Sequence, residues 1–135
     1  MSAITIDRTG TRDGFLRLAL RADATCSGLM GLAGIPLAGW LAETSGTTKA
    51  FEYSMSAFFI AFAVGVFVLS ARPSVTRAGI VIAAGNLLYT VASVIFVLAD
   101  VFPLTATGVV ATLAVGVYTL VMADLQYLGL RRIKR

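Results

Sequence analysis

Two carboxylates are the side chains of this sequence best placed to do chemistry. Asp23 and Asp124 lie inside long apolar segments, one near each end of the chain. An ionisable group buried in hydrocarbon costs at least about 2.5 kcal/mol, so each residue marks a candidate site. If the two met, they could act as exchangeable acids, with Ser27, Asn86 and Gln126 as neighbouring polar groups.

The arginines that flank these segments place both acids at a similar depth. Asp23 follows Arg17 by six residues, about 9 Å along a helix, and Asp124 precedes Arg131 by seven, about 10 Å. Arg17 and Arg21 are long enough to reach a carboxylate each and neutralise it, which is the competing, structural interpretation. Both arginines therefore belong to the predicted polar cluster.

The two acids differ in where they point. Arg21 precedes Asp23 by two residues and points to nearly the opposite helix face, so it cannot easily cover Asp23. Asp124 projects about 100 degrees away from Ala123, which lies on the small-residue face of its helix. The partner of Asp124 could therefore lie on another chain.

Three further polar side chains inside the apolar segments have packing interpretations. Asn86 is expected to join helices by hydrogen bonds worth about 1 kcal/mol. Tyr89 and Tyr118 are expected to be packing aromatics whose hydroxyl groups bind a backbone carbonyl.

Lipid is the expected solvent of this chain. Hydrophobic residues make up 58% of its 135 residues and charged residues 13%. We predict an all-α fold, an antiparallel up-down bundle of four transmembrane helices. Residues 1–13 are expected to be a flexible tail and residues 42–50 the longest loop, and Pro36 is expected to kink the first helix. The membrane domain is residues 14–135, with helices over about 15–41, 51–71, 77–99 and 104–130.

Basic residues lie almost entirely on one side of these helices. Of the eleven Lys and Arg residues, only Lys49 lies on the other side. Because such residues are retained in the cytoplasm, the pattern predicts that the N- and C-termini are both cytoplasmic. The excess of Arg over Lys is typical of GC-rich bacterial genomes, so the predicted location is a bacterial cytoplasmic membrane. The basic end is expected to contact anionic lipid headgroups through Arg131, Arg132, Lys134 and Arg135.

Small residues recur at three- and four-residue spacing along every apolar segment, as in helices that pack closely in membranes. The stripes are Asp23, Ser27, Gly31, Gly34 and Ala38; Ser54, Ala57, Ala61 and Gly65; Gly79, Ala83, Asn86, Thr90 and Ser93; and Thr105, Gly108, Thr112, Gly116, Thr119, Ala123 and Gln126. The predicted packing glycines are Gly31, Gly34, Gly65, Gly79, Gly108 and Gly116. We expect the stripes to meet in a compact, dry bundle.

Composition disfavours several classes of chemistry. The chain has no histidine and one cysteine, so imidazole catalysis and an intrachain disulfide are impossible. No cofactor or metal site is expected, because no phosphate loop, nucleophile with a base, or metal-spaced cluster appears. The net charge of +4 lies at segment ends, so nucleic acid is not an expected partner.

A motif at the start of the first helix resembles a group of small bacterial four-helix integral membrane proteins that are known only as hypothetical proteins. It reads Leu16-Arg17-x-x-Leu20-Arg21-x-Asp23-x-x-x-Ser27-Gly28 and is accompanied by Ala84-Gly85-Asn86 in the third helix. The resemblance implies the same bundle outside the tail and implies no activity. Small multidrug transporters also have four helices, but their glutamate in the middle of the first helix has no counterpart here.

Three functions are compatible with these features. The favoured one is a non-catalytic membrane protein, either an accessory or structural subunit of a larger membrane complex or a homo-oligomer. The alternative is a small proton-coupled transporter that uses Asp23 and Asp124, although no ionisable residue continues its path through the outer half. A third is an enzyme that acts on lipid from the cytoplasmic side, with Arg17 and Arg21 holding a phosphate.

Overall fold

The computed structural model describes the backbone of residues 2–134 and the side chains of residues 12–133. Residues 2–134 form four α-helices: α1 (Ser2–Ser45), α2 (Lys49–Ser70), α3 (Thr76–Leu98) and α4 (Ala106–Lys134). Each helix contains a stretch that is long and apolar enough to cross a membrane. No strand occurs within residues 2–134, so the predicted all-α fold is confirmed.

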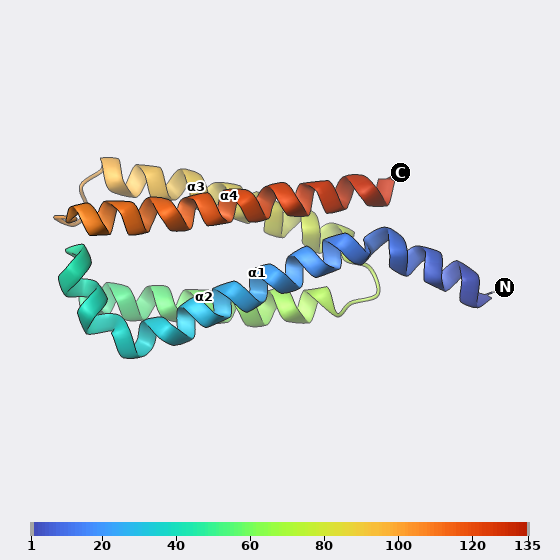
Figure 1. Cartoon of the computed structure of the whole chain (residues 1–135), viewed down its shortest axis with the longest axis horizontal. Helices are drawn as coiled ribbons and strands as arrows, with labels where there is room; N and C mark the ends of the chain where they lie inside the picture. The colour runs from blue at the N-terminus through green and yellow to red at the C-terminus, as the bar shows by residue number, and fades with distance from the viewer. Residues whose placement is uncertain (1, 135) are drawn as a thin grey trace.

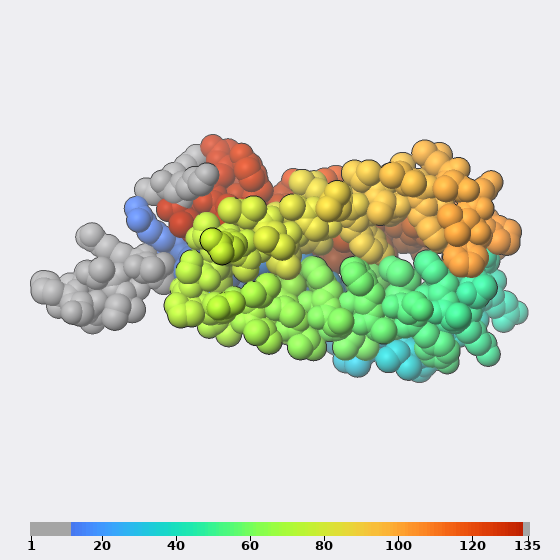
Figure 2. Space-filling view, turned by 180° about the vertical axis from the view of Figure 1, so that it is seen from behind, coloured from blue at the N-terminus to red at the C-terminus, as the bar shows by residue number. Residues whose placement is uncertain are grey.

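The helices pack mainly in two pairs (Figure 1). α1 lies along α2, α3 lies along α4, and α1 also packs against α4 and joins the pairs. The backbones of α2 and α3 come close at few points, and aromatic side chains bridge them. Figure 2 looks onto these two helices, and a furrow separates the atoms of α2 (green) from those of α3 (yellow).

The two ends of the bundle differ in which turns they contain. Both chain termini lie at the same end in Figure 1, together with the turn between α2 and α3, residues 71–75. We call this end the terminal half. The other end contains the turns at residues 46–48 and 99–105, and we call it the loop half.

α1 begins earlier than the sequence predicts. It starts at Ser2, so residues 2–13 are helical where an irregular tail is expected. Asp13 and Arg17, one helical turn apart, form an ion pair of 2.9 Å that supports the helix across this boundary.

α1 also ends later than predicted, at Ser45. Gly46 follows with a φ of 82°, and its N–H donates to the carbonyl oxygen of Ala42 at 2.9 Å, which closes the last turn. The predicted loop 42–50 is therefore only a turn over residues 46–48. The other helices match the predicted bounds to within a few residues, and α4 continues to Lys134.

A bend in α1 agrees with the predicted kink. Figure 1 shows that α1 changes direction within the loop half, and Pro36 lies inside this helix. Proline has no N–H and its ring crowds the preceding turn, so the helix cannot continue straight.

The apolar core lies in the terminal half, whereas bulky side chains cover the outside of the bundle. The buried cluster consists of Leu16, Leu20, Ala24, Val66, Val75 and Ile82. Many large apolar side chains are exposed, for example Leu88 at 70% and Leu98 at 78%. This arrangement suits a protein whose outer surface contacts lipid.

Three of the four small-residue stripes face the interior. The α1 stripe is buried at every position, and the stripes of α3 and α4 are buried or half-buried except for Thr105. On α2 the structure differs from the prediction, because Ser54, Ala57, Ala61 and Gly65 are exposed and Ser56, Ala63, Val66 and Ser70 are buried. Small residues occupy two faces of α2, so their spacing does not decide which face packs.

Five of the six predicted packing glycines lie against another helix. Added Cβ atoms would meet atoms of a neighbouring helix at Gly31, Gly34, Gly79, Gly108 and Gly116. Among the described residues nothing lies within 4 Å of a Cβ built at Gly65, so this glycine makes no close contact with them. The sequence prediction omits Gly129, where a Cβ would lie 2.7 Å from the Cα of Leu16.

Candidate functional site

The side chain of Asp23 is fully buried in the terminal half, and each of its carboxylate oxygens accepts two hydrogen bonds. Oδ1 accepts from the hydroxyl of Tyr118 at 2.7 Å and from that of Ser27 at 3.2 Å. Oδ2 accepts from the amide of Asn86 at 2.8 Å and from that of Gln126 at 2.9 Å. We call these five residues the Asp23 cluster.

Three helices position the cluster. Asp23 and Ser27 are one turn apart on the buried face of α1, Asn86 comes from α3, and Tyr118 and Gln126 come from α4. The Asn86 amide also donates to Oε1 of Gln126 at 3.1 Å, which links α3 directly to α4. Asn86 thus joins helices by hydrogen bonds, as the sequence predicts. The acceptor shared by α1, α3 and α4 is the carboxylate of Asp23.

A second set of hydrogen bonds continues from the cluster towards the loop half, between α3 and α4. The hydroxyl of Thr90 contacts that of Thr119 at 2.8 Å and donates to the carbonyl oxygen of Gly116 at 2.9 Å. These contacts sit where Gly116 lets the two helices approach closely, against the side chain of Ser93.

The predicted arginine partners do not reach Asp23. Arg17 pairs with Asp13 at 2.9 Å and donates to the carbonyl oxygen of Ser70 at 2.5 Å. Nε of Arg21 lies 3.4 Å from the hydroxyl of Ser70. Both arginines therefore join α1 to the end of α2, and the buried carboxylate of Asp23 is surrounded by neutral donors instead.

Asp124 is not part of the cluster, so the predicted shared site of two acids is not formed. Its side chain is exposed on the outside of α4. Gln126 lies two residues further on, and residues two apart point to nearly opposite faces of a helix, so an inward Gln126 requires an outward Asp124. Among residues 12–133, no hydrogen bond or ion pair involves Asp124.

Tyr118 is the cluster member that sequence reasoning misses. The sequence predicts a packing role with a carbonyl partner, and the hydroxyl does lie 3.1 Å from the backbone oxygen of Asp23. Its shorter contact is to the carboxylate. The one sequence feature that points to a buried role for Tyr118 is its position next to Thr119, which lies on the buried stripe of α4.

The predicted lipid-contacting end of α4 is exposed where the structure describes it. Arg131 and Arg132 are exposed, and their guanidinium groups lie over the rings of Tyr127, at 5.9 Å, and Phe15, at 4.4 Å. The side chain of Lys134 and all of Arg135 lie outside the described residues.

The Asp23 cluster is suited to fixing the register of three helices. Hydrogen bonds to a charged group contribute about 1.5–3 kcal/mol each, and removing a buried acceptor leaves its donors without partners. Within residues 12–133, no group of three or more His, Cys, Asp or Glu residues could hold a metal ion. The geometry thus favours a structural role for the carboxylate.

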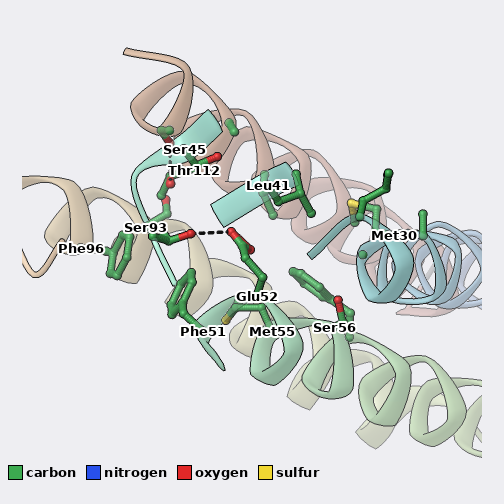
Figure 3. Close-up of a pocket in the computed structure, with 18 of the residues that line it drawn as sticks. Met30, Leu41, Ser45, Phe51, Glu52, Met55, Ser56, Ser93, Phe96 and Thr112 are labelled. Carbon is green, nitrogen blue, oxygen red and sulfur yellow. Dashed lines mark hydrogen bonds between the residues drawn. The ribbon is translucent and has the colours of Figure 1, made fainter. Parts of the chain in front are cut away.

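The loop half contains a second feature, a cavity of about 540 Å³ lined by all four helices (Figure 3). The sequence predicts a dry, compact bundle and does not anticipate this space. Two features account for the cavity. α1 bends within the loop half, and the backbones of α2 and α3 come close at few points, so the four helices leave space between them. Glu52 is the only charged residue among the described residues that line the cavity.

Comparison with families of known proteins, with curated proteins and with solved structures yields no match to this chain.

Proposed function

We propose that this chain is a non-catalytic, multi-pass protein of a bacterial cytoplasmic membrane, where it serves as an accessory subunit of a larger membrane complex or as a homo-oligomer. Its four helices cross the membrane in antiparallel, up-down order. The terminal half, with both chain ends, faces the cytoplasm.

The exposed carboxylate of Asp124 is the observation that carries this proposal. It lies about 10 Å from Arg131 along α4, within the length that crosses the membrane, and has no partner among residues 12–133. An unpaired acid on a lipid-facing surface is costly, whereas a polar or basic group of another chain would compensate it. Asp124 is therefore the centre of the proposed contact.

The exposed small-residue stripe of α2 also supports the proposal. Ser54, Ala57, Ala61 and Gly65 are exposed, and small side chains on an outer face let another helix approach closely. At Gly65 an added Cβ would meet no atom of residues 12–133 within 4 Å, which leaves room for a partner helix.

The proposed orientation is supported by the exposed cations of the terminal half. Arg72, Arg77, Arg131 and Arg132 are all exposed near that end. Lys and Arg near span ends remain in the cytoplasm, and anionic headgroups are suitable partners for them.

The alternative function, a proton-coupled transporter that uses Asp23 and Asp124, has less support. Asp23 lies inside the bundle, enclosed by four donors, whereas Asp124 lies on its outer surface. A carrier of this kind needs an acid that is alternately accessible from both sides of the membrane.

Site-specific photocrosslinking in cells tests the proposed role. A benzophenone amino acid replaces Leu128, one turn from Asp124 and 48% exposed, in one variant and Leu88, which is 70% exposed, in a matched control variant, so that Asp124 is kept in both. We expect a crosslinked protein band from position 128 and none from position 88, with mass spectrometry identifying either a second copy or another membrane protein. Crosslinks from position 128 to lipid only would contradict the proposal.

The orientation is tested separately. Cys26 is replaced by Ser, and single cysteines are placed at Ser74 and at Thr48 for labelling with an impermeant maleimide in intact cells. We expect labelling at position 48 only, and labelling at position 74 only would reverse the proposed topology.

A further inference from the structure

The cavity of the loop half has the size and lining of a small-molecule site. Its volume of about 540 Å³ lies within the range of about 300–1,000 Å³ typical of ligand pockets. Aliphatic, methionine and aromatic side chains form most of the wall, including Met30 of α1 and Met55 of α2. Methionine side chains adapt to ligands of different shape.

One carboxylate enters this apolar wall. Figure 3 shows the side chain of Glu52 directed from α2 into the cavity, and its Oε1 accepts a hydrogen bond from the hydroxyl of Thr47 at 2.9 Å. Among residues 12–133, Glu52 forms no ion pair. Lys49, one turn earlier, does not line the cavity and lies instead beside Gly39. The cavity therefore carries one uncompensated acidic side chain.

Aromatic rings surround the same space from two helices. Phe51 of α2 stacks on Phe96 of α3, with ring centroids 5.3 Å apart, and Phe59 of α2 lies 5.9 Å from Tyr89 of α3. All four rings line the cavity. Aromatic faces attract cations, and they also provide apolar area for the remainder of an organic ligand.

The furrow between α2 and α3 lies over the aromatic rings that bridge these helices. The two backbones come close at few points, Phe51 stacks on Phe96 across the gap, and Figure 2 shows the furrow along the face that the helices form. A ligand that dissolves in the bilayer would pass between these rings to reach the cavity, without crossing the terminal half.

We propose that this cavity binds a lipophilic organic cation, with the carboxylate of Glu52 beside the positive charge and the aromatic rings around the apolar groups. The charge selects a cation over an anion of the same shape, because no basic residue is among the described lining residues. The apolar wall selects organic cations over metal ions, which need several oxygen ligands. The proposal does not depend on the accessory role proposed above.

Tetraphenylphosphonium and tetraphenylborate provide a direct test, because they have nearly the same shape and opposite charges. Each is titrated into the purified full chain in a nonionic detergent, with heats from protein-free micelles subtracted. We expect saturable binding of one tetraphenylphosphonium per chain and no saturable binding of tetraphenylborate.

Two variants separate the charge from general apolar binding. Glu52→Gln removes the negative charge and keeps the side-chain shape, so affinity for tetraphenylphosphonium should fall about tenfold or more. Glu43→Gln is the matched control, because Glu43 is exposed near the end of α1 and does not line the cavity. The Glu43→Gln variant should bind tetraphenylphosphonium as tightly as the unmodified chain does.

Three results would overturn the proposal: no saturable binding of the cation, equal binding of both ions, or equal affinity in Glu52→Gln and Glu43→Gln. Equal binding of both ions would instead indicate a site for an uncharged apolar ligand, such as a lipid acyl chain. If Glu52→Gln does not fold, the comparison of the two ions on the unmodified chain decides the question.

Discussion

The terminal half and the loop half of this bundle are built from similar residue types but pack in different ways. In the terminal half, Gly79 and Gly129 lie against the side chain and backbone of Leu16, and the buried carboxylate of Asp23 has four donors. In the loop half, the same four helices surround a cavity of about 540 Å³. The same number of helices thus produces a closed end and an open end.

The difference shows what closes a membrane bundle. In lipid, apolar surfaces gain nothing by meeting each other, so helices need close backbone contact or hydrogen bonds to associate. The terminal half has both between α1, α3 and α4. In the loop half, glycines bring α1 close to α2 and to α4, and Gly116 brings α4 close to α3, but no glycine contact joins α2 to α3 among the described residues. The aromatic rings of α2 and α3 keep their backbones apart.

The largest effect is expected from filling a glycine contact of the terminal half. Gly129→Leu places a side chain against the backbone of Leu16, which cannot move aside, so the free energy of unfolding should fall by about 3 kcal/mol. Unfolding in detergent measures this. Gly85→Leu is the control, since no atom of the part of the chain that the structure describes lies within 4 Å of a Cβ at Gly85. Equal losses in both variants would show that the close packing of Leu16 is not what closes this half.

A smaller loss is expected from changing the acceptor of the Asp23 cluster. Asp23→Asn replaces one acceptor oxygen by a donating amide that faces other donors, so stability should fall by about 2 kcal/mol. Asp124→Asn, on the exposed side of α4, should change the stability of the isolated chain by less than about 0.5 kcal/mol. The cluster would have no structural role if the two variants melted alike.

The contact between α1 and α2 should be of intermediate sensitivity. Gly31→Leu would press on the side chain of Ile60 and on the backbone oxygen of Ser56, since each has an atom 2.8 Å from an added Cβ, and should cost about 1–2 kcal/mol. The melting temperature in detergent checks this. Gly65→Leu, on the exposed face of α2, is the control, and an unchanged melting temperature in Gly31→Leu would place this glycine on a lipid-facing surface.

The smallest effect is expected in the loop half, where space is available. Ala111→Leu adds methyl groups at the cavity and should change stability by less than about 0.5 kcal/mol in either direction. Ala123→Leu adds the same groups at a residue of the terminal half that is 2% exposed and should cost about 1–3 kcal/mol. A cost at Ala111 as large as that at Ala123 would mean that the two halves are equally closed.

The residues reveal the helices and most of their buried faces, because lipid imposes a strong pattern. Length and hydropathy predict four spans, and on α1 the stripe that ends at Ala38 contains only small residues and Asp23, so one face is clearly distinct. On α2, small residues lie on two faces, so the choice between Gly65 and Ser56 depends on neighbouring helices that the spacing does not encode.

The candidate site is predictable only in part. Ser27, Asn86 and Gln126 lie on inward stripes, so their meeting with Asp23 follows from the helical period. The exclusion of Asp124 follows from the same period, because the two-residue step to Gln126 reverses the helix face. The cavity depends on the bend of α1 and on the spacing of α2 from α3, which are properties of the assembled bundle.

Native methyl groups test the contrast between the two halves most directly. Dissolved oxygen concentrates in hydrocarbon, and its paramagnetic effect on NMR relaxation reports which methyl groups it reaches in the unmodified chain. The methyl groups of Met30 and Met55 line the cavity, whereas those of Ala24 and Ala123 are buried in the terminal half. We expect strong relaxation at both methionines and weak relaxation at both alanines. Equal protection of all four methyl groups would contradict an open loop half.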